Sequence, residues 1–447
     1  MTALSRIRLV VVALAMQAVA CGSEAPDGGP APGDGGLPLD ASTDRLDTST
    51  ARPEADTSTD RPEADSGAAV ADVLPPDAPA ACACAAEHFC SLPSRTCVSA
   101  VIGVAAGNFH TCAVHKDGTV SCWGAGAFIA PGLPDVTPPI RIPLPAAASA
   151  VAVGIEAACA LLAGGEVRCW GKLGPTLSAP AAVVKEDGKP LVGATRVAGG
   201  SLAFCASHPD GTYCWGDNQL GELARPVAMT FPPTTAVLAQ AGPRPLVAAT
   251  VAILVHDGGS RLCGWGTNDS GLVPGGPDLV EQPACVDGVP DVLELAAGDG
   301  HVCVRHSGNA FSCWGQNSGG QLGVGDEAVE QVPIPGARRT LPAPMVTLVS
   351  GAYHACALLA TGALMCWGSN EHGECGLPPS APLFAPTAVA APPMVALGAG
   401  AGAQHTCGIL ADGSVVCWGF DDDGQLGRGV TTVNEDRYAA TPEAVRW

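Results

Sequence analysis

The chain is poor in aromatic residues and in positive charge. Aromatic side chains make up only 4% of its 447 residues, and 22 lysines and arginines stand against 43 aspartates and glutamates, for a net charge of −21. Nucleic-acid-binding proteins rely on cationic side chains to neutralise phosphates, so this balance argues against unaided nucleic-acid binding. The region from about residue 100 onward also lacks a helical period of apolar residues, which favours an all-β fold there.

Long apolar runs are absent except at the N-terminus, where Leu9–Ala20 follows Arg6 and Arg8. This run is too short to span a bilayer and is typical of an export signal, so residues 1–20 are predicted to be a signal peptide. The small residues at its end are followed directly by Cys21, which predicts a lipobox and lipidation of Cys21. Such a lipid would anchor the chain to a membrane without spanning it. The alternative is a secreted or periplasmic protein with an unmodified Cys21.

Residues 21–81 contain little that a hydrophobic core needs. They are rich in Pro, Asp, Thr, Ser, Gly and Ala, and residues 22–81 hold 13 acidic side chains and 3 arginines. Such a segment buries too little apolar surface to offset its ordering entropy. It is predicted to be a disordered linker, kept extended by proline and by repulsion between like charges.

Twenty cysteines are many for a reduced cytosol and indicate an oxidising compartment. Four of them lie close together and predict a small disulfide module over residues 82–98: Cys82, Cys84, Cys90 and Cys97. Three pairings are compatible with the sequence, and a metal site that uses His88 is the alternative.

The rest of the chain, residues 99–447, is periodic. A Trp-Gly pair recurs seven times at spacings of 45 to 53 residues, at Trp123, Trp170, Trp215, Trp265, Trp314, Trp367 and Trp418. Each unit contains short apolar runs around an Asp-Gly or Gly-Gly, which is a strong hairpin signal, and then a proline-rich spacer that suits an edge strand. Seven such units predict a seven-bladed β-propeller.

Within most units two cysteines lie symmetrically around the turn. Cys112 and Cys122 are equidistant from Asp117, so a three-residue loop at Lys116–Gly118 places them opposite each other on antiparallel strands, at a separation that a disulfide can bridge. The predicted pairs are Cys112–Cys122, Cys159–Cys169, Cys205–Cys214, Cys303–Cys313, Cys356–Cys366 and Cys407–Cys417. The Cys205–Cys214 spacing is one residue shorter, so its register must adjust locally.

The fourth unit departs from this pattern. Ala252 is assigned to the first cysteine's place, and Cys263 has Cys285 as a candidate partner, while Cys375 is either a free thiol or the partner of Cys285. His-x-Cys recurs at four positions, where each His is expected to pack near the axis and bond backbone: His110, His301, His354 and His405. Because no constant fourth ligand accompanies them, no metal site is predicted.

The repeated pattern G-x-x-H-x-C-A-L, D-G-x-V-x-C-W-G and N-x-x-G-Q-L-G resembles the regulator-of-chromosome-condensation repeat, in its cysteine-bearing bacterial, alpha-tubulin-suppressor-like form. Gly-Gln-Leu-Gly is intact at residues 320–323 and 424–427. The resemblance implies a seven-bladed propeller in which both chain ends share one blade, so residues 438–447 are expected to supply the outer strand of the first repeat. Nucleotide exchange on a small GTPase, the family's best-known activity, is not expected of an exported acidic chain.

The resemblance to secreted propellers that bind proteins favours a non-catalytic binding or scaffold module, an outer-membrane or cell-surface lipoprotein that acts as a monomer. Its protein partner is expected to contact the segments between repeats, such as residues 126–150, 222–246 and 324–345. No catalytic motif or cofactor site is found, and the acidic run at residues 421–423 is interpreted as a solvated turn. The alternatives are an enzyme that acts on an extracellular or cell-wall polymer and a purely structural envelope component.

Overall fold

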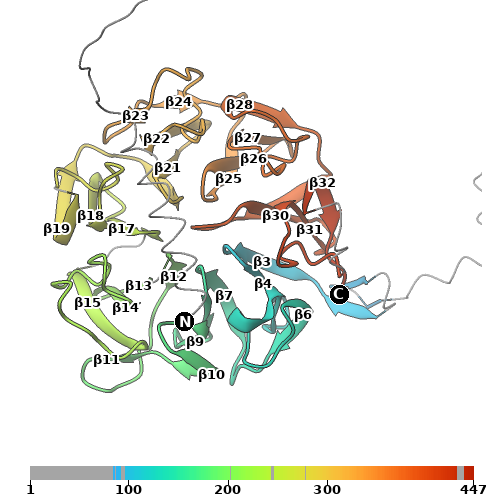
Figure 1. The fold of residues 1–447 in the computed structure, drawn as a ribbon, viewed down its shortest axis with the longest axis horizontal. Coiled ribbons are helices and arrows are strands. Elements are labelled where there is room, and N and C mark those ends of the chain that lie inside the picture. Colours follow the sequence, from blue (N-terminus) through green and yellow to red (C-terminus); the bar gives the residue numbers. More distant parts are fainter. Residues whose placement is uncertain are drawn as a thin grey trace, which may run out of the picture. The chain divides into compact units, whose positions relative to one another are not determined.

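The structure, a computed structural model, describes residues 84–85, 87–91, 96–201, 203–242, 246–276, 278–429 and 437–447. Within these residues seven sheets of four or five strands follow one another around a common centre, as Figure 1 shows. All of them lie in the unit that spans residues 76–447. The predicted seven-bladed β-propeller is therefore confirmed.

The blades are built from strands that are consecutive in the chain. Blade 1 contains β3 (Val101–Ala106), β4 (His110–His115), β5 (Val120–Ala125) and β6 (Val136–Ile142). Blade 2 contains β7 (Ala148–Val153), β8 (Ala157–Leu162), β9 (Val167–Lys172) and β10 (Thr176–Ala182). Blade 3 contains β12 (Arg196–Gly199), β13 (Ala203–His208), β14 (Gly211–Gly216) and β15 (Thr235–Ala241), with β11 (Val184–Lys185) beside β15. A short 3-10 helix, η1 (Gly126–Phe128), follows β5.

Blade 4 contains β16 (Leu246–Ala249), β17 (Ala252–His256), β18 (Arg261–Thr267) and β19 (Leu279–Asp287). Blade 5 contains β20 (Val292–Ala297), β21 (His301–His306) and β22 (Ala310–Gln316), and its outer strand is in two pieces, β23 (Gln331–Val332) and β24 (Arg339–Thr340). Blade 6 contains β25 (Met345–Ser350), β26 (His354–Leu359), β27 (Leu364–Gly368) and β28 (Leu383–Val389). Blade 7 contains β29 (Met394–Gly398), β30 (His405–Leu410), β31 (Val415–Phe420) and β32 (Tyr438–Ala444).

The ends of the chain do not share a blade, which corrects one expectation. β32 pairs with β31 and completes blade 7, whereas β6 already occupies the outer edge of β5 in blade 1. The C-terminus still reaches the first blade, because the ring of Trp447 packs edge-on against Trp123 at 5.4 Å between centroids. The propeller therefore closes by contacts between blades 7 and 1.

The hairpin turns have the predicted register. Cys112 lies opposite Cys122, and Gly118 has a φ of 78°, the left-handed conformation that a three-residue loop with a bulge requires. All six predicted pairs are disulfide-bonded, with Cα atoms 4.0 to 4.1 Å apart. The shorter Cys205–Cys214 unit adjusts by pairing His208 with Gly211 across a two-residue turn.

Blade 4 has its disulfide elsewhere. Cys263 bonds Cys285, which joins β18 to β19 rather than the two middle strands. The assignment of Ala252 to the first cysteine's place was wrong. Ala252 lies opposite Gly266 and so occupies the position that His110 holds in blade 1, while Leu254 occupies the cysteine position. Cys375 is a buried free thiol.

The cysteine-rich segment forms a hairpin on blade 1. β1 (His88–Cys90) pairs with β2 (Cys97–Ser99), and Cys84 bonds Cys97. Cys90 is also disulfide-bonded, and Cys82 lies outside the described residues, as do Cys21, the predicted signal peptide and the linker. The hairpin packs through Phe89 against the Trp447 ring.

The alternation of strand direction gives the propeller two distinct faces. The loops after the first and third strands of each blade emerge on one face, here called the loop face, because consecutive antiparallel strands reverse direction. The Asp-Gly turns and the connections between blades emerge on the other, the turn face. Among the described residues, no helix has the length and apolar character needed to cross a bilayer.

Candidate functional site

The loops after the third strands share one internal design on the loop face. Three residues after the Trp, Asn317 in blade 5 accepts a hydrogen bond from the backbone N–H of Leu322 at 3.1 Å, and its amide donates to the carbonyl of Val329 at 2.7 Å. The same acceptor bond is made by Asn218, Asn268, Asn370 and Asp421 in blades 3, 4, 6 and 7. This explains why the repeated motif begins with Asn.

Each of these loops also fastens the next blade. The carbonyl of the residue four positions after the Asn or Asp accepts the indole N–H of the following blade's Trp, at 2.8 to 3.1 Å. The pairs are Glu222 with Trp265, Leu272 with Trp314, Gln321 with Trp367, Glu374 with Trp418 and Gln425 with Trp123. We call these five loops the latch loops. A buried indole N–H needs an acceptor, so the motif supplies it across the blade boundary.

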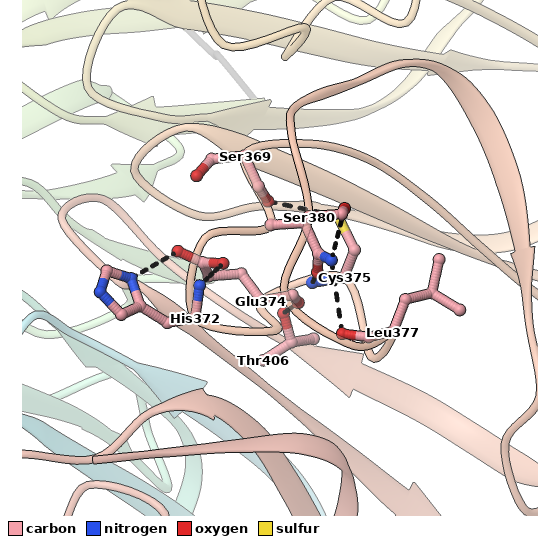
Figure 2. Close-up of polar contacts among 8 residues, drawn as sticks. Ser369, His372, Glu374, Cys375, Leu377, Ser380 and Thr406 are labelled. Carbon is pink, nitrogen blue, oxygen red and sulfur yellow. Dashed lines mark hydrogen bonds and ion pairs between the residues drawn. The ribbon is translucent and has the colours of Figure 1, made fainter. Parts of the chain in front are cut away.

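Figure 2 shows the latch loop of blade 6. The Glu374 carboxylate accepts the backbone N–H of His372 at 2.9 Å, and Thr406 of blade 7 donates to the Glu374 carbonyl at 3.2 Å. Cys375 follows Glu374 in this loop and is buried, and its thiol is 3.4 Å from the carbonyl of Ser369. Burial raises the pKa of the Cys375 thiol well above its usual value, so the thiol stays protonated.

The acidic run at residues 421–423 is only partly the solvated turn that was predicted. Asp421 is buried and takes the place of the motif's Asn. Because a carboxylate cannot donate, Arg428 provides the second contact, with its Nε 2.7 Å from Oδ2 of Asp421. Burial and the neighbouring carboxylates raise the pKa of Asp423 to about 6.

Blades 1 and 2 lack this motif, and the following tryptophans lack its bond. The Trp170 indole N–H has no hydrogen-bond partner, and that of Trp215 lies 3.3 Å from the sulfur of Cys169. The motif's absence after Trp123 and Trp170 is visible in the sequence, and it was the signal that could have predicted the missing indole-to-carbonyl bonds at these two boundaries.

Glu222 is a buried carboxyl in a position that holds glutamine in blades 5 and 7. One oxygen accepts the backbone N–H of Leu220 at 2.8 Å, while the other has no partner. Burial raises the pKa of Glu222 to about 7. Between pH 4.5, the ordinary pKa of this carboxyl, and about pH 7, Glu222 is ionised in the unfolded chain and protonated in the folded chain. The free energy of unfolding therefore falls as the pH rises through this window.

We expect Glu222→Gln to raise the free energy of unfolding by about 2 kcal/mol at pH 8 and by little at pH 4.5, because the amide cannot ionise. Denaturant unfolding at the two pH values measures the difference. Glu374→Gln is the matched control, since the second carboxylate oxygen of Glu374 already contacts His372 Nδ1 at 3.2 Å. An equal gain in both variants would contradict this account.

The four histidines of the His-x-Cys motif are buried and begin the second strands of blades 5, 6, 7 and 1. His354 and His405 bond the hydroxyls of Thr406 and Thr111 in the next blade, at 2.7 and 2.6 Å. His301 and His110 have no partner, because the corresponding residues of their neighbours are Ala355 and Ala158. His354 and His405 therefore bond side chains of the next blade rather than the expected backbone. In the described part of the chain no three His, Cys, Asp or Glu side chains are grouped to hold a metal.

Two grooves open between blades. One of about 240 Å³ lies between blades 2 and 3 and is lined by Pro175, Met229 and Phe231, among others. It occurs where blade 2 has no latch loop, and Val227 and Met229 are exposed within it. A second, of about 470 Å³, lies between blades 4 and 5 and is lined by Val273 and Ile334 together with Asn268 and Gln331.

A third cavity, of about 210 Å³, lies on the axis between the inner strands. It is lined mostly by Ala, Gly, Leu and Val, with Glu294 as its charged group. The Glu294 carboxylate is already satisfied by Arg305 at 3.0 Å and by the backbone N–H of Leu348 at 3.0 Å. The axial cavity therefore offers no free charge to a ligand.

The segments predicted to contact a partner are only partly loops. Residues 126–150 and 324–345 include the outer strands β6, β23 and β24, and residues 222–246 include β15. The parts that reach the loop face are 126–135, 222–234 and 324–330. Of these, only 222–234 lines a groove described above. Ile334 of the second groove lies in the predicted segment 324–345, whereas the groove residue Val273 was missed.

Comparison with known proteins agrees with this architecture. Residues 101–128, 346–374 and 399–425, and residues 307–358 and 361–409, match the family described as the Regulator of chromosome condensation (RCC1) repeat. The Ultraviolet-B receptor UVR8 of Arabidopsis thaliana is 27% identical over 210 residues, 46% of this chain and 46% of UVR8. The probable E3 ubiquitin-protein ligase HERC4 of Rattus norvegicus is 27% identical over 163 residues, 35% of this chain and 15% of HERC4. The chain thus spans less than half of these relatives.

Two solved structures share the fold at low sequence identity. Yeast RCC1 (Prp20), solved with Kap60 bound, superposes with a TM-score of 0.55 at 20% identity, over 67% of this chain and 78% of its own. Human WBSCR16 superposes with a TM-score of 0.56 at 20% identity, over 67% of this chain and 85% of its own. Parts of the chain in blades 1, 5, 6 and 7 therefore match the RCC1 repeat, and the described residues fold as a seven-bladed propeller with one disulfide in each blade.

Proposed function

We propose that the chain is a non-catalytic binding module of the cell envelope, tethered through a lipid on Cys21, which recognises a protein partner on its loop face. The observation that carries this proposal is the groove between blades 2 and 3. Its exposed Val227 and Met229 are 37% and 48% accessible and lie beside Phe231. Apolar side chains in a concave site with a polar rim are typical of protein recognition.

The disulfides support the same proposal. A bond in every blade holds the frame rigid, and such bonds persist in an oxidising compartment outside the cytoplasm. Loops on a rigid frame lose little entropy when they bind, which favours recognition.

A photocrosslinking residue placed at Met229 tests the proposal in the cells that produce the protein. We expect one discrete protein adduct of reproducible mass, and we expect Phe231→Ser to reduce it strongly because Phe231 lines the same groove. The same crosslinker at Val346, on the turn face, is the control and should not yield that adduct. Failure to recover any discrete adduct from position 229 would refute recognition at this groove.

A further inference from the structure

The inner strands of five blades carry a β-bulge at the same place. The register shifts by one residue near the start of β3, β7, β20, β25 and β29, so the second residue of each strand is left unpaired. These residues are Ile102, Ser149, Leu293, Val346 and Val395. A bulge redirects a side chain, and these residues lie at the turn-face end of their strands.

Four of the five bulge residues are aliphatic and exposed. Ile102, Leu293, Val346 and Val395 have accessibilities of 52%, 45%, 48% and 54%. They belong to the four successive blades 5, 6, 7 and 1, whose inner strands are neighbours around the axis in Figure 1. We call these four residues the bulge ring. Single exposed aliphatic residues are ordinary, but a repeated set on one face marks an interaction surface.

The chain next to the bulge ring is also apolar. The connection before β25 is Leu-Pro-Ala-Pro at 341–344, and the one before β29 is Ala-Ala-Pro-Pro at 390–393. The connection before β7 of the neighbouring blade 2 is Pro-Leu-Pro-Ala-Ala at 143–147. None of them contains a charged residue, and the connection before blade 5 contains only Asp291, which pairs with Arg338 at 3.6 Å. The connections that precede blades 6, 7 and 2 are therefore apolar on the turn face, with charges farther out on the Asp-Gly turns.

We infer that the bulge ring rests on the lipid surface to which the chain is anchored; this inference rests on the tethering proposed above. The segment that would carry the lipid enters the described structure at Cys84, and the β1–β2 hairpin leads from there directly into β3, beside Ile102. The tether thus joins the propeller on the turn face. A tether holds the propeller near the bilayer and so strengthens weak apolar contacts.

A lipid surface fits better than a second copy of the chain. Each copy of the chain is acidic, and repulsion between two copies opposes face-to-face association. The same charge predicts which lipids are favoured. Zwitterionic lipid should bind the bulge ring better than anionic lipid, because anionic headgroups repel the acidic rim.

Vesicle sedimentation tests this inference with the exported chain carrying Cys21→Ser, which removes the acyl anchor and leaves the turn face intact. We expect it to sediment with phosphatidylcholine vesicles, and to bind more weakly when phosphatidylglycerol replaces part of the lipid. Ile102→Ser/Val346→Ser/Val395→Ser should need at least about tenfold more lipid for half-binding, because three exposed aliphatic contacts are lost. Val227→Ser/Met229→Ser, on the loop face, is the matched control and should bind like its parent.

Three results would overturn the inference: no sedimentation at any lipid concentration, a bulge-ring variant that binds like its parent, or a dimer in sedimentation equilibrium that the bulge-ring variant abolishes. The tethering itself is measured separately, by palmitate labelling of the wild-type chain and of Cys21→Ser. A chain without label that still binds vesicles through the bulge ring would refute the tether and keep the lipid-binding face. A labelled wild-type chain whose Cys21→Ser form does not bind vesicles would keep the tether and refute the lipid-binding face.

Discussion

Trp367→Ala is expected to lower the free energy of unfolding by about 4 kcal/mol. Trp367 is fully buried, and its indole N–H donates to the carbonyl of Gln321 in the preceding blade at 3.0 Å. The substitution leaves a large cavity and removes the bond across the blade boundary, which leaves a buried carbonyl without its donor. Denaturant unfolding of the oxidised protein measures the loss.

Phenylalanine separates the two contributions. Trp367→Phe keeps most of the ring volume and removes the N–H, whereas Trp170→Phe removes an N–H that has no partner. We therefore expect Trp367→Phe to cost about 1–2 kcal/mol more than Trp170→Phe. Equal losses in the two phenylalanine variants would show that the latch-loop bond contributes nothing beyond packing.

The second large effect concerns acid. Burial lowers the pKa of His110 and of His301 to about 3, from an ordinary value of 6.5. As the pH falls through 6.5 the unfolded chain takes up these protons while the folded chain does not, so folding stability declines from about pH 7 toward pH 3. At pH 5 this amounts to about 2 kcal/mol for each histidine.

We expect His110→Ala/His301→Ala to lose about 4 kcal/mol less stability than the wild type between pH 8 and pH 5. Alanine is tolerated at this position, because Ala157, Ala203 and Ala252 occupy it in blades 2, 3 and 4. Glu222, Asp299 and Asp423 have raised pKa values and oppose the acid loss, but they are present in both proteins and cancel in the comparison.

The control for this prediction is Val346→Ala, since Val346 is exposed and has no titratable group. Its pH dependence should match the wild type. If the double variant also follows the wild-type curve between pH 8 and pH 5, the buried histidines do not cause the acid sensitivity.

The parts of the fold that depend on local sequence were predictable. The Trp-Gly spacing gave the number of blades, and the symmetry of Cys112 and Cys122 about Asp117 gave the disulfide register, because a hairpin is fixed by its own turn. Contacts between blades were not predictable in the same way. The partner of Trp123 is Gln425, 302 residues away, and nothing local links the two.

The same distinction explains the errors. The position of Ala252 was misread because the cysteine that marks the register elsewhere is missing from β17. The outer strand of blade 1 was assigned to the C-terminus by family resemblance, although the spacer after Trp123 supplies β6. The candidate grooves depend on how the loops of neighbouring blades pack against each other, which is a property of the assembled ring.

The distribution of latch loops has a consequence for how the ring holds together. Where the two ends of the propeller meet, Gln425 accepts from Trp123 and Thr111, both at 2.9 Å, and His405 bonds Thr111. Between blades 1 and 2, within continuous chain, Trp170 and His110 lack partners altogether. The gap in the covalent chain is thus bridged by side-chain hydrogen bonds that the uninterrupted joint between blades 1 and 2 lacks. At the gap, these hydrogen bonds take the role that the continuous polypeptide has between blades 1 and 2.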